Sequence, residues 1–119
     1  MPKVYFFDLG LRNFFVSNFK SFEIREDRGS LLENAVWRQL LEKYDENSIR
    51  FWRTIQKNEV DFVAGEELAF EVKSRAEQFK EKAYKIFKAN YPNVDLSIVS
   101  LDSKIERLGN HKILEVWQI

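Results

Sequence analysis

Residues 59–73, EVDFVAGEELAFEVK, decide the fold, because two strand-like segments meet there around a glycine-containing turn. The second segment alternates apolar side chains on one face with Glu71 and Lys73 on the other, as a strand with one buried face would. The same period on the first segment places Asp61 on the face opposite its apolar neighbours. The stretch therefore predicts an antiparallel hairpin that carries two acids and a lysine on one face.

The length of the turn follows from the apolar pattern. A two-residue loop at Gly65-Glu66 would place Asp61 opposite Phe70 and mix polar with apolar side chains. A three-residue loop, residues 65–67, brings both apolar faces into one core, with Gly65 or its neighbour in the left-handed conformation. The predicted cross-strand pairs are Phe62–Phe70, Val60–Val72 and Asp61–Glu71.

These paired acids point to a divalent cation. Directly opposite residues of antiparallel strands have Cα atoms about 4.5–5.5 Å apart, and two carboxylates that close repel unless a cation or a proton lies between them. Mg²⁺ prefers carboxylate oxygens and water, and Lys73 on the same face would orient water or neutralise phosphate. The alternative is an ordinary exposed face, because Glu-x-Lys is common on strands, where opposite charges stabilise sheets modestly.

The rest of the chain supplies helices and further strands around this hairpin. Together they predict an α/β fold with the core order α-β-β-β-α-β, a mixed sheet flanked by helices. The predicted strands are 4–7, 49–54, 60–64, 68–73, 96–100 and 113–117, and the predicted helices are 9–16, 30–44 and 76–89.

Several side chains carry their own predictions. Ser30 and Glu33 have the spacing of a capping box at a helix start. His111, the single histidine, is expected at the surface. The helix predicted over 76–89 should bury Phe79, Ala83, Ile86 and Phe87, and Trp37, Trp52 and Trp117 should lie in the core rather than stack on bases.

Composition limits the classes of protein. A chain of 119 residues is one domain, and zero Cys excludes disulfides, thiolate metal sites and cysteine nucleophiles. No apolar run of membrane-spanning length and no signal-peptide pattern is present, so a cytoplasmic location is expected. The 19 basic and 19 acidic residues balance, yet residues 73–88 hold six bases against two acids. This local excess would either attract phosphate or form a solvated lysine face on an ordinary helix.

Four sequence blocks carry a family resemblance. The hairpin resembles the PD-(D/E)XK motif of restriction endonuclease-like folds, including archaeal Holliday-junction resolvases. Together the blocks resemble the C-terminal domain of prokaryotic AAA+-type ATPases, in the same order and over nearly the whole chain. They are KVYFFDLGL at 3–11, GSLLEN at 29–34, FWR at 51–53 and EVDF at 59–62.

This resemblance implies a restriction endonuclease-like core over 23–119 and an N-terminal strand and short helix over 1–22, which would join a missing upstream region. It implies a DNA endonuclease that hydrolyses phosphodiester bonds with Mg²⁺ or Mn²⁺, held by Asp61, Glu71 and Glu33, while Lys73 assists the attacking water. An ATPase module upstream or in trans and a homodimer are further implied partners. No GxxxxGK[ST] phosphate loop is present, so the chain itself has no nucleotide site.

Four further side chains are candidates for DNA contact: Arg53, Arg75, Gln78 and Lys80. Arg53 would contact phosphate or pair with a surface acid, and Asn34 would cap or orient beside Glu33. The competing hypothesis is an inactive module that keeps the nuclease fold and serves DNA docking or protein assembly.

Overall fold

A six-stranded mixed sheet forms the centre of the chain, in the order β1-β2-β3-β4-β6-β5. The computed structural model describes residues 3–101 and 103–119. The strands are β1 (Ile49–Arg53), β2 (Glu59–Ala64), β3 (Leu68–Val72), β4 (Asp95–Val99), β5 (Arg107–Leu108) and β6 (His111–Leu114). The helices are α1 (Leu9–Phe15), α2 (Arg28–Leu40) and α3 (Lys85–Asn90), with 3-10 turns η1 (Phe22–Ile24), η2 (Glu46–Ser48), η3 (Ala76–Gln78), η4 (Glu81–Tyr84) and η5 (Val116–Gln118).

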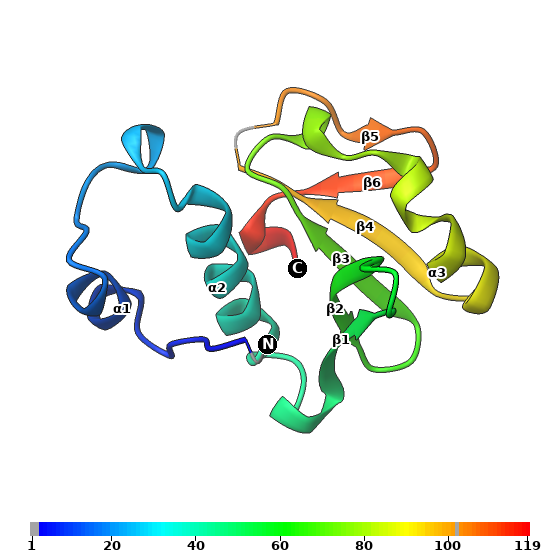
Figure 1. Ribbon diagram of the computed structural model, residues 1–119, viewed down its shortest axis with the longest axis horizontal. Coiled ribbons are helices and arrows are strands. Elements are labelled where there is room, and N and C mark those ends of the chain that lie inside the picture. The colour runs from blue at the N-terminus through cyan, green and yellow to red at the C-terminus, as the bar shows by residue number, and fades with distance from the viewer. Residues whose placement is uncertain (1–2, 102) are drawn as a thin grey trace.

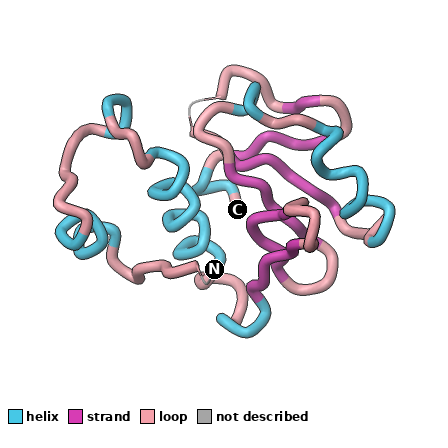
Figure 2. Tube along the Cα trace, viewed as in Figure 1, coloured by secondary structure: helices cyan, strands magenta, loops and turns pink. Residues whose placement is uncertain are grey.

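The predicted α/β class and the core order α-β-β-β-α-β are confirmed by α2, β1, β2, β3, α3 and β4. Strands β1, β2 and β3 are antiparallel neighbours, whereas β4 runs parallel to β3 and to β6. Helices α1 and α2 lie on one side of the sheet, and α3 lies on the other (Figures 1 and 2). Two apolar cores, one on each face, hold these layers together.

The β2–β3 hairpin has the predicted three-residue loop. Gly65 takes the left-handed conformation with φ of 64°, and Phe62 pairs with Phe70. The remaining predicted pairs are wrong, because the ladder runs only from Ala64–Leu68 to Phe62–Phe70. At that point the Asp61 carboxylate accepts the backbone N–H of Val72 at 2.9 Å, in the place of a strand carbonyl.

This break in the ladder changes the facing of the first strand. Phe62 packs in the α2-side core, whereas Val60 packs in the α3-side core together with Ala69, so the predicted common face of Val60 and Phe62 is wrong. Strand β1 carries a matching irregularity between Arg50 and Trp52. As a result Asp61 leaves the regular alternation and lies where β2 and β3 separate.

Helix α2 begins two residues before the predicted start. Arg28 is its first residue, Asp27 is the N-cap, and the Leu31 N–H already donates to the Asp27 carbonyl at 2.9 Å. Ser30 therefore lies inside the helix, and the predicted capping box with Glu33 is wrong. Apolar side chains of α2 cover the sheet from this side: Leu32, Val36, Trp37 and Leu40.

The long helix predicted over 76–89 is wrong; η3, η4 and α3 replace it. The Gln78 side chain accepts the Arg75 N–H at 3.1 Å and closes the first turn, after which Phe79 is extended. The Phe79 ring then stacks on Tyr84 with centroids 4.6 Å apart. Phe79 and Phe87 are buried as predicted, but Ala83 and Ile86 are exposed, because the break rotates them away from the sheet.

The N-terminal segment is extended without joining a sheet, so the strand predicted over 4–7 is wrong. The Asn34 side chain acts in place of a neighbouring strand, because it accepts the Phe6 N–H at 2.9 Å and donates to the Phe6 carbonyl at 2.8 Å. The short helix predicted after it is confirmed as α1, and the Asp8 side chain caps it. Residues 1 and 2 of the predicted 1–22 segment lie outside the described part.

Two C-terminal predictions are also wrong. His111 is buried, with its Nδ1 2.8 Å from the Leu96 carbonyl, because it lies on β6 beside the α3-side core. Trp117 is 68% exposed, because η5 ends the predicted strand and turns its ring outward. Within residues 3–101 and 103–119, no helix is long and apolar enough to cross a membrane.

Candidate active site

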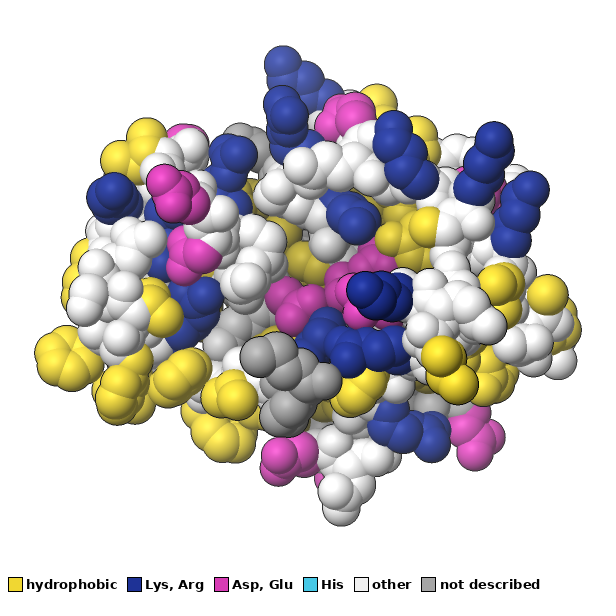
Figure 3. Space-filling view, in the orientation of Figure 1, with side chains coloured by type: hydrophobic (Ala, Val, Ile, Leu, Met, Phe, Trp, Pro, Cys, Tyr) yellow, Lys and Arg dark blue, Asp and Glu magenta, His cyan; other side chains and the backbone are white. Residues whose placement is uncertain are grey.

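The predicted acids meet in a cleft between α2 and the end of the β2–β3 hairpin. This carboxylate cleft has a volume of about 380 Å³. Acidic side chains gather in the hollow at the centre of the face in Figure 3, with basic side chains beside them. Its lining is Gly29, Ser30, Glu33, Lys57, Asn58, Glu59, Asp61, Glu71, Val72, Lys73, Ala83 and Tyr84. The structure thus brings Glu33, Asp61, Glu71 and Lys73 together.

Asp61 is the central acid of the cleft. It is buried, and its carboxyl group is in hydrogen-bonding contact with both Glu71 and Glu33. Burial, followed by the hydrogen bond and charge of Glu71, raises the pKa of Asp61 to about 7, against the opposing effect of the Val72 N–H. Asp61 therefore holds a proton far more readily than an exposed aspartate.

Glu33 reaches the cleft from the second turn of α2. Its carboxylate accepts the Tyr5 hydroxyl at 2.8 Å and a Lys3 Nζ–H at 3.2 Å. Burial and the neighbouring Asp61 raise the pKa of Glu33, while Tyr5 and Lys3 oppose that shift. Because no backbone cap engages it, the Glu33 side chain belongs to the acid cluster rather than to the helix start.

Glu71 and Lys73 enter the cleft from β3 and the residue beyond it. Glu71 is buried and hydrogen-bonds the Tyr84 hydroxyl; burial, then this contact, raises the pKa of Tyr84. Lys73 is half-buried, and its backbone N–H donates to the Val99 carbonyl at 2.9 Å, which fixes the residue beside β4. The cleft therefore has buried carboxyl groups, and Lys73 contributes to its lining.

The donor chemistry of this cleft fits a hard divalent cation. Mg²⁺ takes carboxylate oxygens and is usually held by only one or two of them, with water and phosphate completing its shell. In the part of the chain that the structure describes, no group of three or more His, Asp or Glu side chains forms a preformed metal-binding set. The residues present fit an ion held by two of the three carboxylates, with the third as a neighbour.

The four candidate DNA-contact residues lie outside the cleft lining. Arg53 pairs with Glu59 at 3.3 Å and lies over the Phe51 ring at 5.3 Å, which matches its predicted pairing with a surface acid. Arg75 and Gln78 form the η3 turn, where Gln78 binds backbone. Lys80 is exposed beyond it.

Three residues of the site were missed from the sequence. Lys3 donates a hydrogen bond to Glu33 and lies 3.5 Å from Asp61. Tyr5 also donates to Glu33, and the Tyr84 hydroxyl forms a hydrogen bond with Glu71. The first block of the resemblance contains Lys3 and Tyr5, so their place in it was the available signal. No such signal pointed to Tyr84, because the predicted helix over 76–89 did not turn its side chain toward the sheet.

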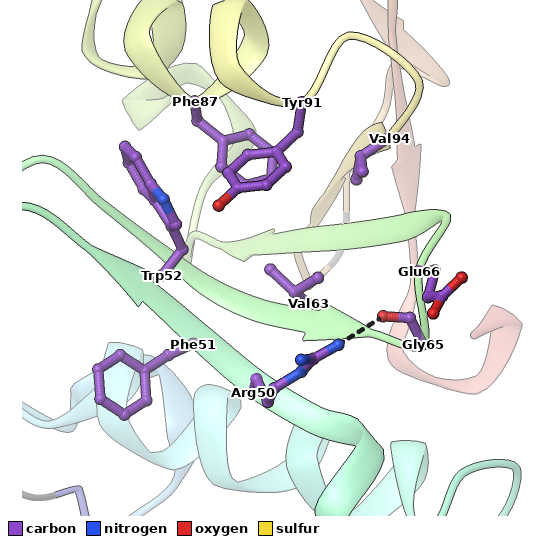
Figure 4. A pocket seen from close by; sticks show the side chains of 9 residues that line it. All are labelled: Arg50, Phe51, Trp52, Val63, Gly65, Glu66, Phe87, Tyr91 and Val94. Atoms are coloured by element: carbon purple, nitrogen blue, oxygen red, sulfur yellow. Dashed lines mark hydrogen bonds between the residues drawn. The ribbon is translucent and has the colours of Figure 1, made fainter.

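A second pocket, of about 350 Å³, lies at the other end of the hairpin near Gly65. Figure 4 shows Trp52, Phe87 and Tyr91 gathered on one side of the strands, while the Phe51 ring points to the other side. The Arg50 guanidinium donates to the Gly65 carbonyl at 3.3 Å. Trp52 packs edge-on against Phe87 with centroids 5.2 Å apart, so this tryptophan contributes to the core, as predicted.

The comparisons with known proteins agree with the extent of the sheet and of α2. The model of a family described as a domain of unknown function, DUF4143, matches residues 28–119. Neither the curated proteins nor the solved structures gave a match.

Proposed function

The chain belongs to the DUF4143 family, and from this premise we propose that its carboxylate cleft is a metal-dependent site that hydrolyses DNA phosphodiester bonds. The observation that carries the proposal is the meeting of Glu33, Asp61 and Glu71 in one open cleft with Lys73 in its wall. Carboxyl groups packed this closely destabilise one another unless a proton or cation intervenes. Perturbed acids in a cleft favour a functional site over a structural one.

We assign each side chain of the cleft a role according to its position. Asp61 and Glu71 would hold Mg²⁺ or Mn²⁺, and Glu33 would adjust the charge of the site from α2. When bound, such an ion supplies polarisation of the phosphate and acidification of water. The Lys73 ammonium would stabilise negative charge that develops on the phosphate or orient the attacking water. Tyr84 orients Glu71 through its hydroxyl, and the Val72 N–H orients Asp61.

Binding of DNA is supported by the residues that follow the cleft. Residues 73–88 carry six bases against two acids, and these bases are spread from the end of β3 through η4 into α3. Such a patch would attract the phosphate backbone without reading sequence. DUF4143 is found in AAA-type ATPase-associated proteins, so we further propose that an ATPase module, upstream or in trans, delivers the DNA.

Cleavage of a DNA panel tests this proposal. The full chain is incubated with branched, linear and single-stranded DNA, with Mg²⁺ or Mn²⁺ and with chelator. Glu71→Gln is expected to lower the cleavage rate at least about 100-fold, because the loss of one carboxylate ligand raises the barrier by roughly 2.7 kcal/mol or more. The matched control is Glu66→Gln, the same change in the Gly65 loop, which should cleave like wild type. Equal cleavage by Glu71→Gln and Glu66→Gln would sink the enzymatic proposal.

An assembly module is the second candidate, and the exposed apolar side chains of the N-terminal segment favour it. Phe7, Phe14, Phe15, Phe19 and Ile24 are each at least 65% exposed. Apolar surface of this kind marks protein-binding surfaces when it is contiguous. Concentration-dependent sizing separates the two functions: self-association lost in Phe14→Ser, with no cleavage on any DNA, would favour assembly.

A further inference from the structure

A cation that belongs to the chain lies against two acids of the carboxylate cleft. The Lys3 ammonium lies 3.2 Å from Glu33 Oε1 and 3.5 Å from Asp61 Oδ1. Its side chain is 21% exposed, and those of Glu33 and Asp61 are 20% and 10% exposed. An ammonium so placed faces the carboxylate oxygens that a divalent ion would need. Because like charges at this spacing repel, a metal ion and Lys3 compete for the same acids.

The segment that carries Lys3 is anchored by contacts independent of that lysine. The Tyr5 ring stacks on Trp37 with centroids 5.4 Å apart, and Phe7 packs on the same tryptophan at 5.1 Å. Asn34 holds the Phe6 backbone through both its N–H and its carbonyl. Lys3 therefore precedes an anchored part of the chain, and its side chain can leave the acids while residues 5–7 stay in place.

We propose that Lys3 is a tethered counter-ion that closes the carboxylate cleft and must withdraw when a divalent cation binds. This rests on the proposed function of the same cleft, and it makes Lys3 an autoinhibitory strap that residues 5–7 anchor. The metal affinity of the chain is then set partly by the strap. Any partner that draws the N-terminal segment away from Glu33 would raise that affinity.

Direct titration with Mn²⁺, followed by calorimetry or by the signal of the free ion, tests the strap without any cleavage assay. Lys3→Met is expected to bind Mn²⁺ at least about 10-fold more tightly than wild type, because it removes the competing charge. Lys3→Arg, which keeps the charge, should bind like wild type. The matched control is Lys57→Met, which removes the same charge from the lining of the same cleft. Lys57→Met should change the affinity for Mn²⁺ by less than about threefold, because charges separated by water interact weakly.

Two results would overturn the strap: equal affinities of Lys3→Met and wild type, or no Mn²⁺ binding by either chain. The added change Asp61→Ala must abolish the gain in Lys3→Met; a gain that persists places the ion elsewhere and also overturns the proposal. Failure of the cleavage function is distinguishable. If wild type cuts no DNA while Lys3→Met gains Mn²⁺ affinity, the strap stands and the nuclease proposal falls. If wild type cuts DNA while wild type and Lys3→Met bind Mn²⁺ equally, the nuclease proposal stands and the strap falls.

Discussion

Two charged clusters lie along α2, and they have opposite balances of charge. At the helix start, two guanidinium groups surround one carboxylate: Arg25 Nε and Arg12 Nη1 lie 2.8 and 3.0 Å from Asp27. Asn13 accepts a further Arg25 N–H at 3.0 Å. In the cleft, Glu33 and Asp61 lie 3.2 and 3.5 Å from one ammonium, that of Lys3, and Asp61 also contacts Glu71. In the first cluster the carboxylate is saturated with cationic partners, whereas in the second Asp61 lies against two further acids.

This difference separates a cluster that stabilises the fold from the cluster for which we propose a function. The hydrogen bond from Arg25 holds the pKa of Asp27 well below its usual range, with Arg12 acting in the same direction. Burial and the neighbouring Glu71 raise the pKa of Asp61 instead. Stability favours the first arrangement and opposes the second. A cluster that costs the fold stability points to a role in binding or catalysis.

The largest effect is expected when the saturated cluster loses its acid. Asp27→Ala leaves two buried guanidinium groups without their carboxylate. The free energy of unfolding at pH 7 should fall by about 2–3 kcal/mol, measured by urea denaturation. The control is Asp45→Ala at the exposed start of η2, where the side chain makes no cap hydrogen bond. Equal losses in the two variants would show that Asp27 is not a structural centre.

An effect of opposite sign is expected in the cleft. Asp61→Asn keeps an oxygen for the Val72 N–H but cannot ionise. An unfolded aspartate has a pKa near 3.9, and the pKa of native Asp61 is about 7. Between these values the native state binds the proton more tightly, so the stability of the wild type falls as pH rises through this window.

The advantage of Asp61→Asn over wild type should therefore grow by about 1–3 kcal/mol between pH 5 and pH 8. Urea denaturation in the presence of chelator measures it without interference from metal ions. The Asp27 cluster should behave in the opposite way, because its stabilisation is complete above pH 4 and is lost as pH falls below that value. A pH-independent difference between Asp61→Asn and wild type would contradict the raised pKa of Asp61.

The sequence predicts the acids of the site better than their geometry. Alternation along β3 and the Gly65 turn locate Glu71 and the loop length correctly, because both are local properties of the chain. The pairing of Asp61 with Glu71 fails, because the Asp61 side chain takes the Val72 N–H and ends the ladder. A side chain that replaces a backbone acceptor does not change the alternation of apolar and polar residues, so the sequence gives no sign of it.

Tertiary contacts explain the other failures. Phe79 leaves the predicted helix because its ring stacks between Tyr84 and His111, at 4.6 and 5.1 Å. His111 is buried for the same reason, and a single-residue surface preference cannot anticipate it. Glu33 looked like a helix cap because its spacing from Ser30 fits, but the helix starts at a charged cluster formed with distant Arg12. The contacts of Phe79 with His111 and of Asp27 with Arg12 join segments that are far apart in sequence.

The smallest effect on stability is expected at an exposed ion pair on the rim of the cleft. Arg53 and Glu59 lie 3.3 Å apart, with side chains 33% and 50% exposed. Pairs this open contribute little, so Arg53→Gln should change the free energy of unfolding by less than about 0.5 kcal/mol. The surface pair Arg38–Glu42 on α2, 2.6 Å apart, offers the matched control Arg38→Gln.

DNA binding separates Arg53 from this control. If Arg53 exchanges Glu59 for phosphate, Arg53→Gln should weaken binding about equally for all sequences and reduce the salt slope by about one. Arg38→Gln should leave both quantities unchanged. Titration of a labelled duplex between low and moderate salt measures them. Because the stability of the two variants is expected to match, any difference in the salt slope reports a phosphate contact rather than a damaged fold; identical slopes would assign Arg53 to surface pairing alone.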